Sequence, residues 1–216
     1  MLEKMGEFFD ARLCGYEEHQ LTCIDSAQEF YPFTASCLPQ VNGTRLLDLG
    51  CGTGLELGYY FEMVPSAEIT GVDLAPGMLE KLRSKFPDKL LTLVLGSYFD
   101  VPFDEESYDA AVSVKSLHHF TKEEKTLLYK KLRKALKPGG CFILTDYFAA
   151  SEEEERFYFA ELLRLKKEQN ITEEDFYHFD TPLTVEHEKE ALTEAGFACV
   201  EVLKNWGATY TLKAIK

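Results

Sequence analysis

The segment Leu-Leu-Asp-Leu-Gly-Cys-Gly-Thr-Gly, residues 46–54, joins an apolar run to a glycine-rich turn. The run over Thr44–Leu49 predicts a buried strand, and the residues from Leu55 onward predict a helix. Three glycines stand at alternate positions between the two and leave no side chains where a bound ligand must touch the backbone. A strand, a glycine-rich turn and a helix in this order predict a binding site for a nucleotide cofactor.

The spacing of these glycines separates two kinds of cofactor site. Gly50, Gly52 and Gly54 follow a Gly-x-Gly-x-Gly pattern, whereas dinucleotide sites need the third glycine one residue later, where Leu55 stands here. An NAD-dependent dehydrogenase is therefore disfavoured. With the acid Asp48 in the preceding strand, the pattern resembles motif I of the class I S-adenosylmethionine-dependent methyltransferases.

Apolar and amphipathic segments alternate along the chain, which predicts an α/β fold with a Rossmann-like, doubly wound sheet covered on both faces. The predicted strands are Thr44–Leu49, Glu68–Val72, Leu90–Leu95, Tyr108–Val114, Gly140–Thr145, Phe197–Leu203 and Ala208–Ala214. The predicted helices between them are Leu55–Val64, Pro76–Phe86, Thr121–Leu136 and Thr184–Ala195. The short segment 205–207 predicts an antiparallel hairpin. The family resemblance implies a seven-stranded sheet in the order 3-2-1-4-5-7-6, mostly parallel, with an antiparallel last strand.

Two regions lie outside this repeating unit. Residues 1–40 predict a helical N-terminal cap, and residues 149–180 predict a helical insertion before the sixth strand that covers the substrate. The length of 216 residues suits a single methyltransferase domain over 1–216. Two capping boxes are predicted, by Thr121 with Glu124 and by Ser151 with Glu154.

The overall charge and the cysteines exclude several classes of function. A net charge of −14 argues against broad contact with nucleic acid or an anionic membrane, because both need clustered Lys and Arg. No apolar run reaches membrane-spanning length and no signal peptide pattern is present, so we expect a cytoplasmic protein. The six cysteines show no C-x-x-C pair and no zinc-site spacing, which predicts reduced thiols and no metal site.

The resemblance assigns the adenosine part of S-adenosylmethionine to residues after the second and third strands. Asp73 opens Asp-Leu-Ala-Pro-Gly-Met-Leu, which matches a family segment whose acid accepts hydrogen bonds from both ribose hydroxyls. Leu74 and Met78 then flank the adenine. Relatives usually have Asp where Ser97 stands, and a serine hydroxyl makes a weaker contact with the adenine amino group. Tyr98 is expected beside the adenine ring or in the core.

The amino acid end of the cofactor is expected at the glycine turn, against the backbone of Gly50, Gly52 and Gly54. Asp48 either faces this end or anchors the turn through its backbone N–H groups. Lys115 stands where many relatives have a small residue, and three roles stay open for it. Lys115 could contact the cofactor carboxylate, it could contact an anionic substrate, or it could be an exposed lysine without a function.

Leu117-His118-His119-Phe120 follows the fourth strand, at the edge where open α/β sheets bind ligands. The segment resembles one in small-molecule methyltransferases related to ubiquinone, menaquinone and tRNA carboxymethoxyuridine enzymes. There the histidines shape the cofactor pocket, although one of them could act as a general base, as could Tyr16 or Tyr147. Adjacent histidines alone do not make a metal site.

Three further segments are expected near the substrate. Phe8-Phe9-Asp10-Ala11-Arg12 and Tyr16 resemble a segment that caps the cofactor in the same branch, which makes Arg12 and Tyr16 candidates for contact with the methionine end or the substrate. Asp146-Tyr147 and the segment 177–180 could reach the same pocket. Helix packing is the alternative for each of these segments.

These motifs predict an S-adenosylmethionine-dependent methyltransferase that moves a methyl group to a small-molecule acceptor by in-line displacement. Two alternatives stay open: a tRNA or protein methyltransferase, and a noncatalytic S-adenosylmethionine-binding module, for which Ser97 is the only indication. The acceptor is not predicted, and the protein is expected to be a monomer or a homodimer.

Overall fold

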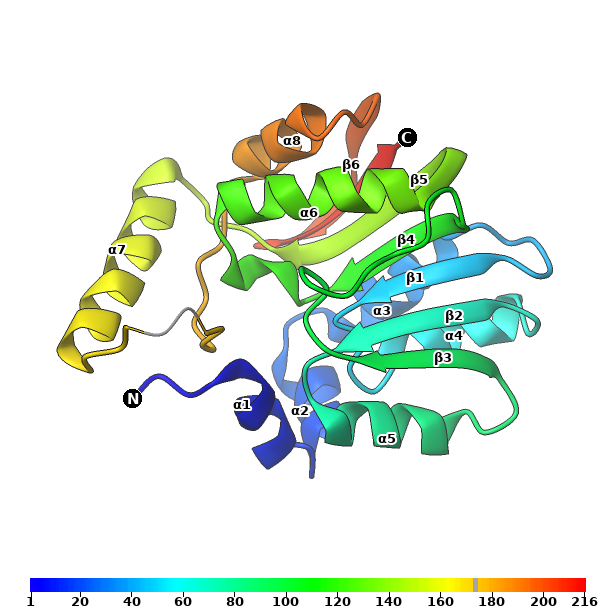
Figure 1. Ribbon diagram of the computed structural model, residues 1–216, viewed down its shortest axis with the longest axis horizontal. Helices are drawn as coiled ribbons and strands as arrows, with labels where there is room; N and C mark the ends of the chain where they lie inside the picture. The colour runs from blue at the N-terminus through cyan, green and yellow to red at the C-terminus, as the bar shows by residue number, and fades with distance from the viewer. Residues whose placement is uncertain (173–174) are drawn as a thin grey trace.

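A mixed sheet of seven strands, in the order β3-β2-β1-β4-β5-β7-β6, forms the centre of the computed structural model, which describes residues 1–172 and 175–216 (Figure 1). The strands are β1 (Arg45–Leu49), β2 (Glu68–Asp73), β3 (Leu90–Leu95), β4 (Tyr108–Val114), β5 (Leu136–Tyr147), β6 (Cys199–Trp206) and β7 (Thr209–Ile215). Strands β1 to β5 pair in parallel, and β7 runs antiparallel to both β5 and β6. The predicted fold class and strand order are confirmed.

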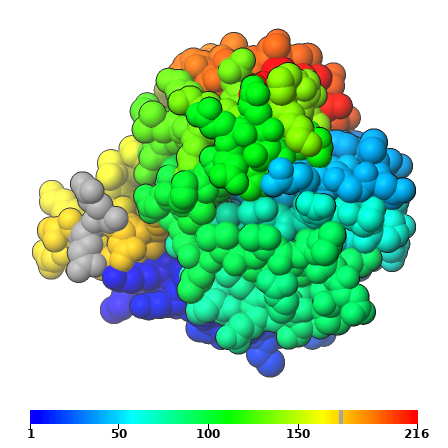
Figure 2. All heavy atoms as spheres, turned by 45° about the vertical axis from the view of Figure 1, so that its right-hand side comes forward, coloured from blue at the N-terminus to red at the C-terminus, as the bar shows by residue number. Residues whose placement is uncertain are grey.

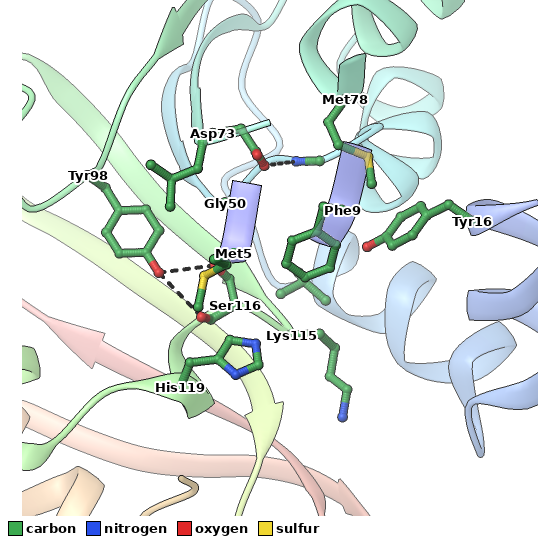
Figure 3. Close-up of a pocket in the computed structure, with 13 residues that line it drawn as sticks. Met5, Phe9, Tyr16, Gly50, Asp73, Met78, Tyr98, Lys115, Ser116 and His119 are labelled. Atoms are coloured by element: carbon green, nitrogen blue, oxygen red, sulfur yellow. Dashed lines mark hydrogen bonds between the residues drawn. The ribbon is translucent and has the colours of Figure 1, made fainter. Parts of the chain in front are cut away.

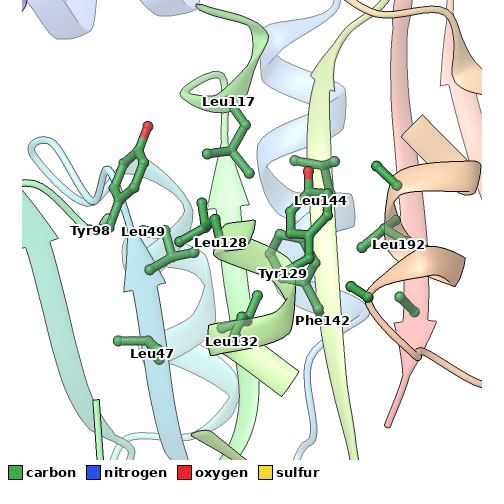
Figure 4. Close-up of a cluster of buried hydrophobic side chains, with 14 of the residues drawn as sticks. Leu47, Leu49, Tyr98, Leu117, Leu128, Tyr129, Leu132, Phe142, Leu144 and Leu192 are labelled. Carbon is green, nitrogen blue, oxygen red and sulfur yellow. The ribbon is translucent and has the colours of Figure 1, made fainter. Parts of the chain in front are cut away.

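Helices cover both faces of this sheet because neighbouring residues of a strand point to opposite sides. Leu46 packs with α3, α4 and α5 on one face, and Leu47 packs with α6 and α8 on the other (Figure 4). The helices are α1 (Met5–Ala11), α2 (Tyr16–Cys23), α3 (Ala27–Ser36), α4 (Leu55–Met63), α5 (Pro76–Lys85), α6 (Lys122–Ala135), α7 (Glu152–Glu168) and α8 (Val185–Glu194), with the 3-10 turn η1 (Leu117–His119). Among the described helices, none has the length and apolar character that a bilayer crossing requires.

Two predicted boundaries are wrong by a few residues. Strand β5 begins at Leu136, four residues before the predicted Gly140, because fully buried Leu136 pairs with Tyr108 and a register shift follows in the ladder. The hairpin turn lies at 207–208 instead of 205–207, since Trp206 still pairs with Thr209. Gly207 has φ +56°, a conformation that glycine adopts without steric cost.

The two predicted capping boxes differ in the structure. Thr121 accepts from the Glu124 backbone N–H and Glu124 accepts in return from the N–H of Thr121, so the box at α6 is complete. At α7, Ser151 accepts from the N–H of Glu154, but the Glu154 carboxylate accepts from the N–H of Ala150. The second box is therefore only half formed.

Helices α1 and α2 of the predicted N-terminal cap and the insertion lie beyond the carboxyl ends of the strands (Figure 1), whereas α3 packs on a face of the sheet. The insertion contains one helix, α7, and its residues 173–174 lie outside the described part of the chain. Figure 2 shows the N-terminal segment, in dark blue, against the insertion, in yellow and orange. Phe8 and His178 stack with ring centroids 3.5 Å apart, and Lys4 forms a β-bridge with Tyr177. These contacts join the two regions into one cover.

Candidate active site

The glycine turn after β1 has a backbone that only glycine adopts without strain. Gly50, Gly52 and Gly54 have φ of +71°, +48° and +67°. A Cβ at Gly50 would lie 2.1 Å from the Ser116 hydroxyl oxygen, and one at Gly54 would lie 2.5 Å from Leu82 Cδ1. A Cβ at Gly52 would meet no atom closer than the Tyr16 hydroxyl oxygen at 3.9 Å. Gly50 and Gly54 therefore permit close packing, whereas Gly52 leaves open space.

Asp73, at the end of β2, connects this turn to the start of α5. One carboxylate oxygen accepts from the N–H of Gly52 at 2.8 Å, and the other accepts from the N–H of Ala75 at 2.9 Å. Burial raises the pKa of Asp73, and the backbone N–H groups act against that shift. The carboxylate is thus fixed at the edge where β1 and β2 end.

A cavity opens between the glycine turn, Asp73 and helix α1, with an enclosed volume of about 50 Å³ that continues into space open to solvent (Figure 3). The predicted site residues that line it are Tyr16, Gly50, Gly52, Asp73, Leu74, Met78, Tyr98, Lys115 and His119. Met5, Phe9, Val114 and Ser116 also line it, although the sequence did not single them out as site residues. Phe9 lies in the capping segment and Ser116 beside the histidine pair, whereas no local pattern identifies Met5. Adjacency to a motif could therefore have indicated Phe9 and Ser116.

Four predicted residues do not line this cavity. Asp48 is fully buried behind the glycine turn, and within the described residues no N–H or hydroxyl group donates to its carboxylate. Gly54 faces Leu82, away from the opening. The Ser97 hydroxyl accepts from the N–H of Phe99 at 3.1 Å, and His118 lies in a neighbouring cavity.

The anchoring role considered for Asp48 is not seen in this structure, since no backbone N–H donates to it. Its carboxyl group lies next to that of Glu56, which is also buried. Burial, followed by the neighbouring Glu56, raises the pKa of Asp48 well above its usual range. The two acids behind the turn therefore favour a shared proton over two charges.

The Tyr98 hydroxyl lies in the first cavity and reaches the segment after β4. Its oxygen is 3.3 Å from the Ser116 carbonyl oxygen, to which it donates, and 3.2 Å from the Ser116 hydroxyl oxygen (Figure 3). Tyr98 is also part of a buried cluster with Leu49 and Leu117 (Figure 4). Both roles considered for Tyr98 are thus compatible with its position.

The two histidines after β4 have different environments. His118 Nδ1 lies 2.5 Å from a carboxylate oxygen of Asp146, and its Nε2 lies 3.4 Å from Asp180. His119 Nδ1 lies 3.0 Å from the Phe179 carbonyl oxygen and 3.3 Å from Asp180. A carbonyl oxygen can only accept, so Nδ1 of His119 donates and Nε2 is the unprotonated nitrogen of the neutral ring.

These environments give the two histidines different protonation states. Burial opposes the charged form of His118, but Asp146 and Asp180 overcome it and raise the pKa of His118 to about 9. Burial and the adjacent His118 charge lower the pKa of His119 to about 3. At neutral pH the first histidine is therefore cationic and the second is neutral.

His118, His119 and Asp180 also bring three potential metal ligands together, with their ligand atoms within 4.8 Å of one another. A metal ligand must be deprotonated, and the two carboxylates beside His118 stabilise its protonated form. The contacts of His118 with the two carboxylates therefore compete with metal binding.

A second, larger cavity adjoins the first. Both are lined by Phe9, Tyr16, Lys115 and His119. Arg12, His118, Tyr147 and Asp180 were predicted near the substrate, and all four line the second cavity. Its remaining walls come from Phe8, Ala11, Cys14, Gly15, His19, Gln20, Ile24 and His178. The two cavities therefore lie side by side and share part of their lining.

Comparison with known proteins agrees with this architecture. Residues 46–140 match the family model of a methyltransferase domain. The biotin biosynthesis bifunctional protein of Teredinibacter turnerae is 30% identical over 190 residues, 84% of this chain and 30% of that protein. The demethylmenaquinone methyltransferase of Symbiobacterium thermophilum is 35% identical over 110 residues, 48% of this chain and 43% of that protein. The chain thus spans less than half the length of either relative.

A solved structure shares most of the fold. The S-adenosylmethionine-dependent methyltransferase from Mesorhizobium loti superposes with a TM-score of 0.63 at 21% identity, covering 86% of this chain and 96% of that one. A sheet with a reversed seventh strand and a glycine turn facing an acid at the end of the second strand define a Rossmann-like methyltransferase. Residues 46–140 thus belong to a methyltransferase domain family, and the chain has the fold of class I S-adenosylmethionine-dependent methyltransferases.

Proposed function

We propose that this protein transfers a methyl group from S-adenosylmethionine to a small-molecule acceptor. The observation that carries the proposal is the pair of adjoining cavities: one lies between Asp73 and the glycine turn, and the other shares Tyr16, Lys115 and His119 with it. The first suits the cofactor, since the open space at Gly52 allows a ligand to approach the backbone and the carboxylate of Asp73 can accept from a ribose diol. The second provides space for an acceptor.

The lining of the first cavity suggests how each end of the cofactor is held. Asp73 would accept hydrogen bonds from the ribose hydroxyls, and Leu74, Met78 and Tyr98 would pack around the adenine. Gly50 and Gly52 would present their backbone to the methionine end, close to Tyr16. Gly54 and Ser97 would act indirectly, Gly54 by allowing the turn to pack against Leu82 and Ser97 by supporting the loop after β3.

The cofactor supplies an activated methyl group when bound. The task of the chain is therefore to orient the acceptor toward that methyl group and to exclude water. Phe9, Tyr16 and His119 line the boundary where the acceptor would meet the methyl group. Orientation of this kind contributes up to roughly 7–11 kcal/mol in well-aligned reactions. His118 is protonated at neutral pH, so it is not the base. His119 Nε2 is the available acceptor, and its low pKa suits a nucleophile that ionises readily.

A small-molecule acceptor fits better than tRNA or a protein. The net charge of −14 opposes contact with nucleic acid, and the second cavity is bounded by α1, α2 and the segment 178–180. We further propose that residues 1–216 act as one domain, as a monomer or homodimer, and in the cytoplasm, where the six free cysteines stay reduced.

Labelled S-adenosylmethionine incubated with a cell metabolite extract tests this function. The wild-type protein is expected to produce labelled small molecules, and Asp73→Ala is expected to abolish them. Asp88→Ala, which removes an exposed acid after α5, is the matched control and should behave like the wild type. Labelled products that persist undiminished in Asp73→Ala would contradict the assigned cofactor site. Cofactor binding without any labelled product would favour the noncatalytic module.

A further inference from the structure

Lys115 is a largely buried cation without a direct ion pair. Within the described residues, its ammonium group has one hydrogen-bond partner, the Thr209 hydroxyl at 3.4 Å. The carboxylates of Asp146 and Asp180 act on it electrostatically, but neither lies within ion-pair distance. The ammonium nitrogen also lies 5.3 Å from the ring centroid of Tyr147 and 6.0 Å from that of Phe30. Burial lowers the pKa of Lys115, and the carboxylates of Asp146 and Asp180 only partly oppose that shift, so an anion in direct contact with the ammonium group would be bound favourably.

The backbone at Lys115 is also unusual. Its φ is +53°, in the left-handed region that a long side chain without local hydrogen bonding adopts only at a cost. The backbone is held there by a hydrogen bond from its N–H to the Thr145 carbonyl oxygen at 2.9 Å. Strain of this kind persists where the surrounding structure enforces it, often at a ligand site. The backbone conformation of Lys115 therefore fixes the starting point of its side chain in the lining that the two cavities share.

The side chain extends from that wall away from Asp73 and Met78 (Figure 3). It therefore points away from the adenosine end of the first cavity. The ammonium group lies near Tyr147, which lines the second cavity only. The position of Lys115 thus favours contact with an acceptor over contact with the cofactor.

Among the described residues that line the second cavity, the other charged side chains already have partners within ion-pair distance. Arg12 pairs with Glu3 at 3.0 Å and lies over the Phe8 ring. Asp180 lies between His118 and His119, and Asp146 lies against His118. Lys115 is the cation of this lining that has no carboxylate within ion-pair distance.

We propose that the methyl acceptor carries an anionic group, a carboxylate or a phosphate, that pairs with the ammonium group of Lys115. The apolar part of the acceptor would lie against Phe8, Phe9 and Ile24 in the same cavity. The inference rests on the proposed function and narrows it to anionic acceptors with an apolar body. It places a cationic contact inside a protein whose overall charge is strongly negative.

The test fractionates the metabolite extract on an anion exchanger at pH 7.5 and incubates each fraction with protein and labelled S-adenosylmethionine. Labelled product is expected only from the retained fraction, and phosphatase treatment of that fraction before incubation distinguishes a phosphate ester from a carboxylate. Product formed only from the unretained fraction would overturn the inference while leaving the proposed function intact. No product from any fraction would instead overturn the proposed function.

Lys115→Asn tests the residue itself, because asparagine tolerates the left-handed backbone and the variant should fold. We expect at least a tenfold higher KM for the retained acceptor, with partial recovery in Lys115→Arg. Affinity for S-adenosylhomocysteine should stay within about twofold of the wild type. Lys134→Asn, at an exposed lysine of α6, is the control. An unchanged KM, or a tenfold loss of S-adenosylhomocysteine affinity, would overturn the assignment of Lys115 to the acceptor.

Discussion

The carboxylate of Asp146 at the end of β5 lies 2.5 Å from Nδ1 of His118 in the 3-10 turn after β4. The same carboxylate accepts from the backbone N–H of Leu117 at 2.8 Å and of Tyr147 at 2.9 Å. His118 in turn reaches Asp180 of the insertion. One imidazolium thus joins the edge of the sheet to the cover of the acceptor cavity.

This contact predicts a pH-dependent stability. The pKa of His118 is about 9 in the folded protein and roughly 6.5 when unfolded. The stabilising effect of the protonated ring is therefore complete below about pH 6.5 and is lost as pH rises through 9. Urea unfolding at pH 6 and pH 9.5 should show the wild type losing up to about 3 kcal/mol more than His118→Gln over this interval. Equal losses for the two proteins would contradict the prediction.

Gly50→Ala should disrupt the glycine turn. The new Cβ would lie 2.1 Å from the Ser116 hydroxyl oxygen, and the backbone has φ +71°. Gly139→Ala is a matched control, because Gly139 has φ +77° but a Cβ there meets nothing within 4 Å. We expect the control to cost about 1 kcal/mol through backbone strain alone and Gly50→Ala to cost clearly more. Denaturant midpoints measure the difference, and similar costs would mean that Ser116 moves aside freely.

Asp73→Ala should weaken cofactor binding directly. It removes the acceptor for the Gly52 N–H as well as the carboxylate proposed for the ribose. A lost hydrogen bond to a charged group corresponds to a roughly 10- to 100-fold lower affinity. Calorimetric titration with S-adenosylhomocysteine measures the change, with Asp88→Ala as the unaffected control. Affinity equal to the wild type would show that the cofactor binds elsewhere.

Asp48→Asn should stabilise the ligand-free protein at alkaline pH. The pKa of Asp48 is raised in the folded protein, so folding favours its protonated, neutral form. The stability that this form contributes is complete below the unfolded pKa near 4, and it is lost as pH rises through the folded pKa. Asparagine stays neutral and avoids this loss. At pH 8 we expect the variant to be at least about 1 kcal/mol more stable than the wild type, with the gain shrinking toward pH 4.

Thermal or urea unfolding across that range measures the effect of Asp48→Asn. Asp88→Asn should show no comparable gain, since its side chain is exposed. A destabilised Asp48→Asn protein at pH 8 would mean that the carboxylate is needed in its charged form.

Local patterns predicted the fold well because they reflect local physics. The capping box of Thr121 with Glu124 and the strand at Glu68–Val72 depend on neighbouring residues and lie where the sequence placed them. The start of β5 was missed because Leu136 is held by pairing with Tyr108, a contact between residues distant in sequence. The Ser97 hydroxyl accepts from the N–H of Phe99, a local contact that serine often makes in turns, whereas the comparison with the family motif suggested a contact with adenine.

The sequence by itself determined the sheet, the glycine turn and the methyl-donor family, because strand periodicity, glycine spacing and short motifs are properties of neighbouring residues. The tertiary structure alone decided the charges at the site. Asp146, from β5, and Asp180, from the insertion, set the protonation of His118, and Lys115, buried between Phe30 and Tyr147, has no carboxylate within ion-pair distance. Such electrostatic effects depend on distance in space and on exclusion of water, which the order of residues does not state.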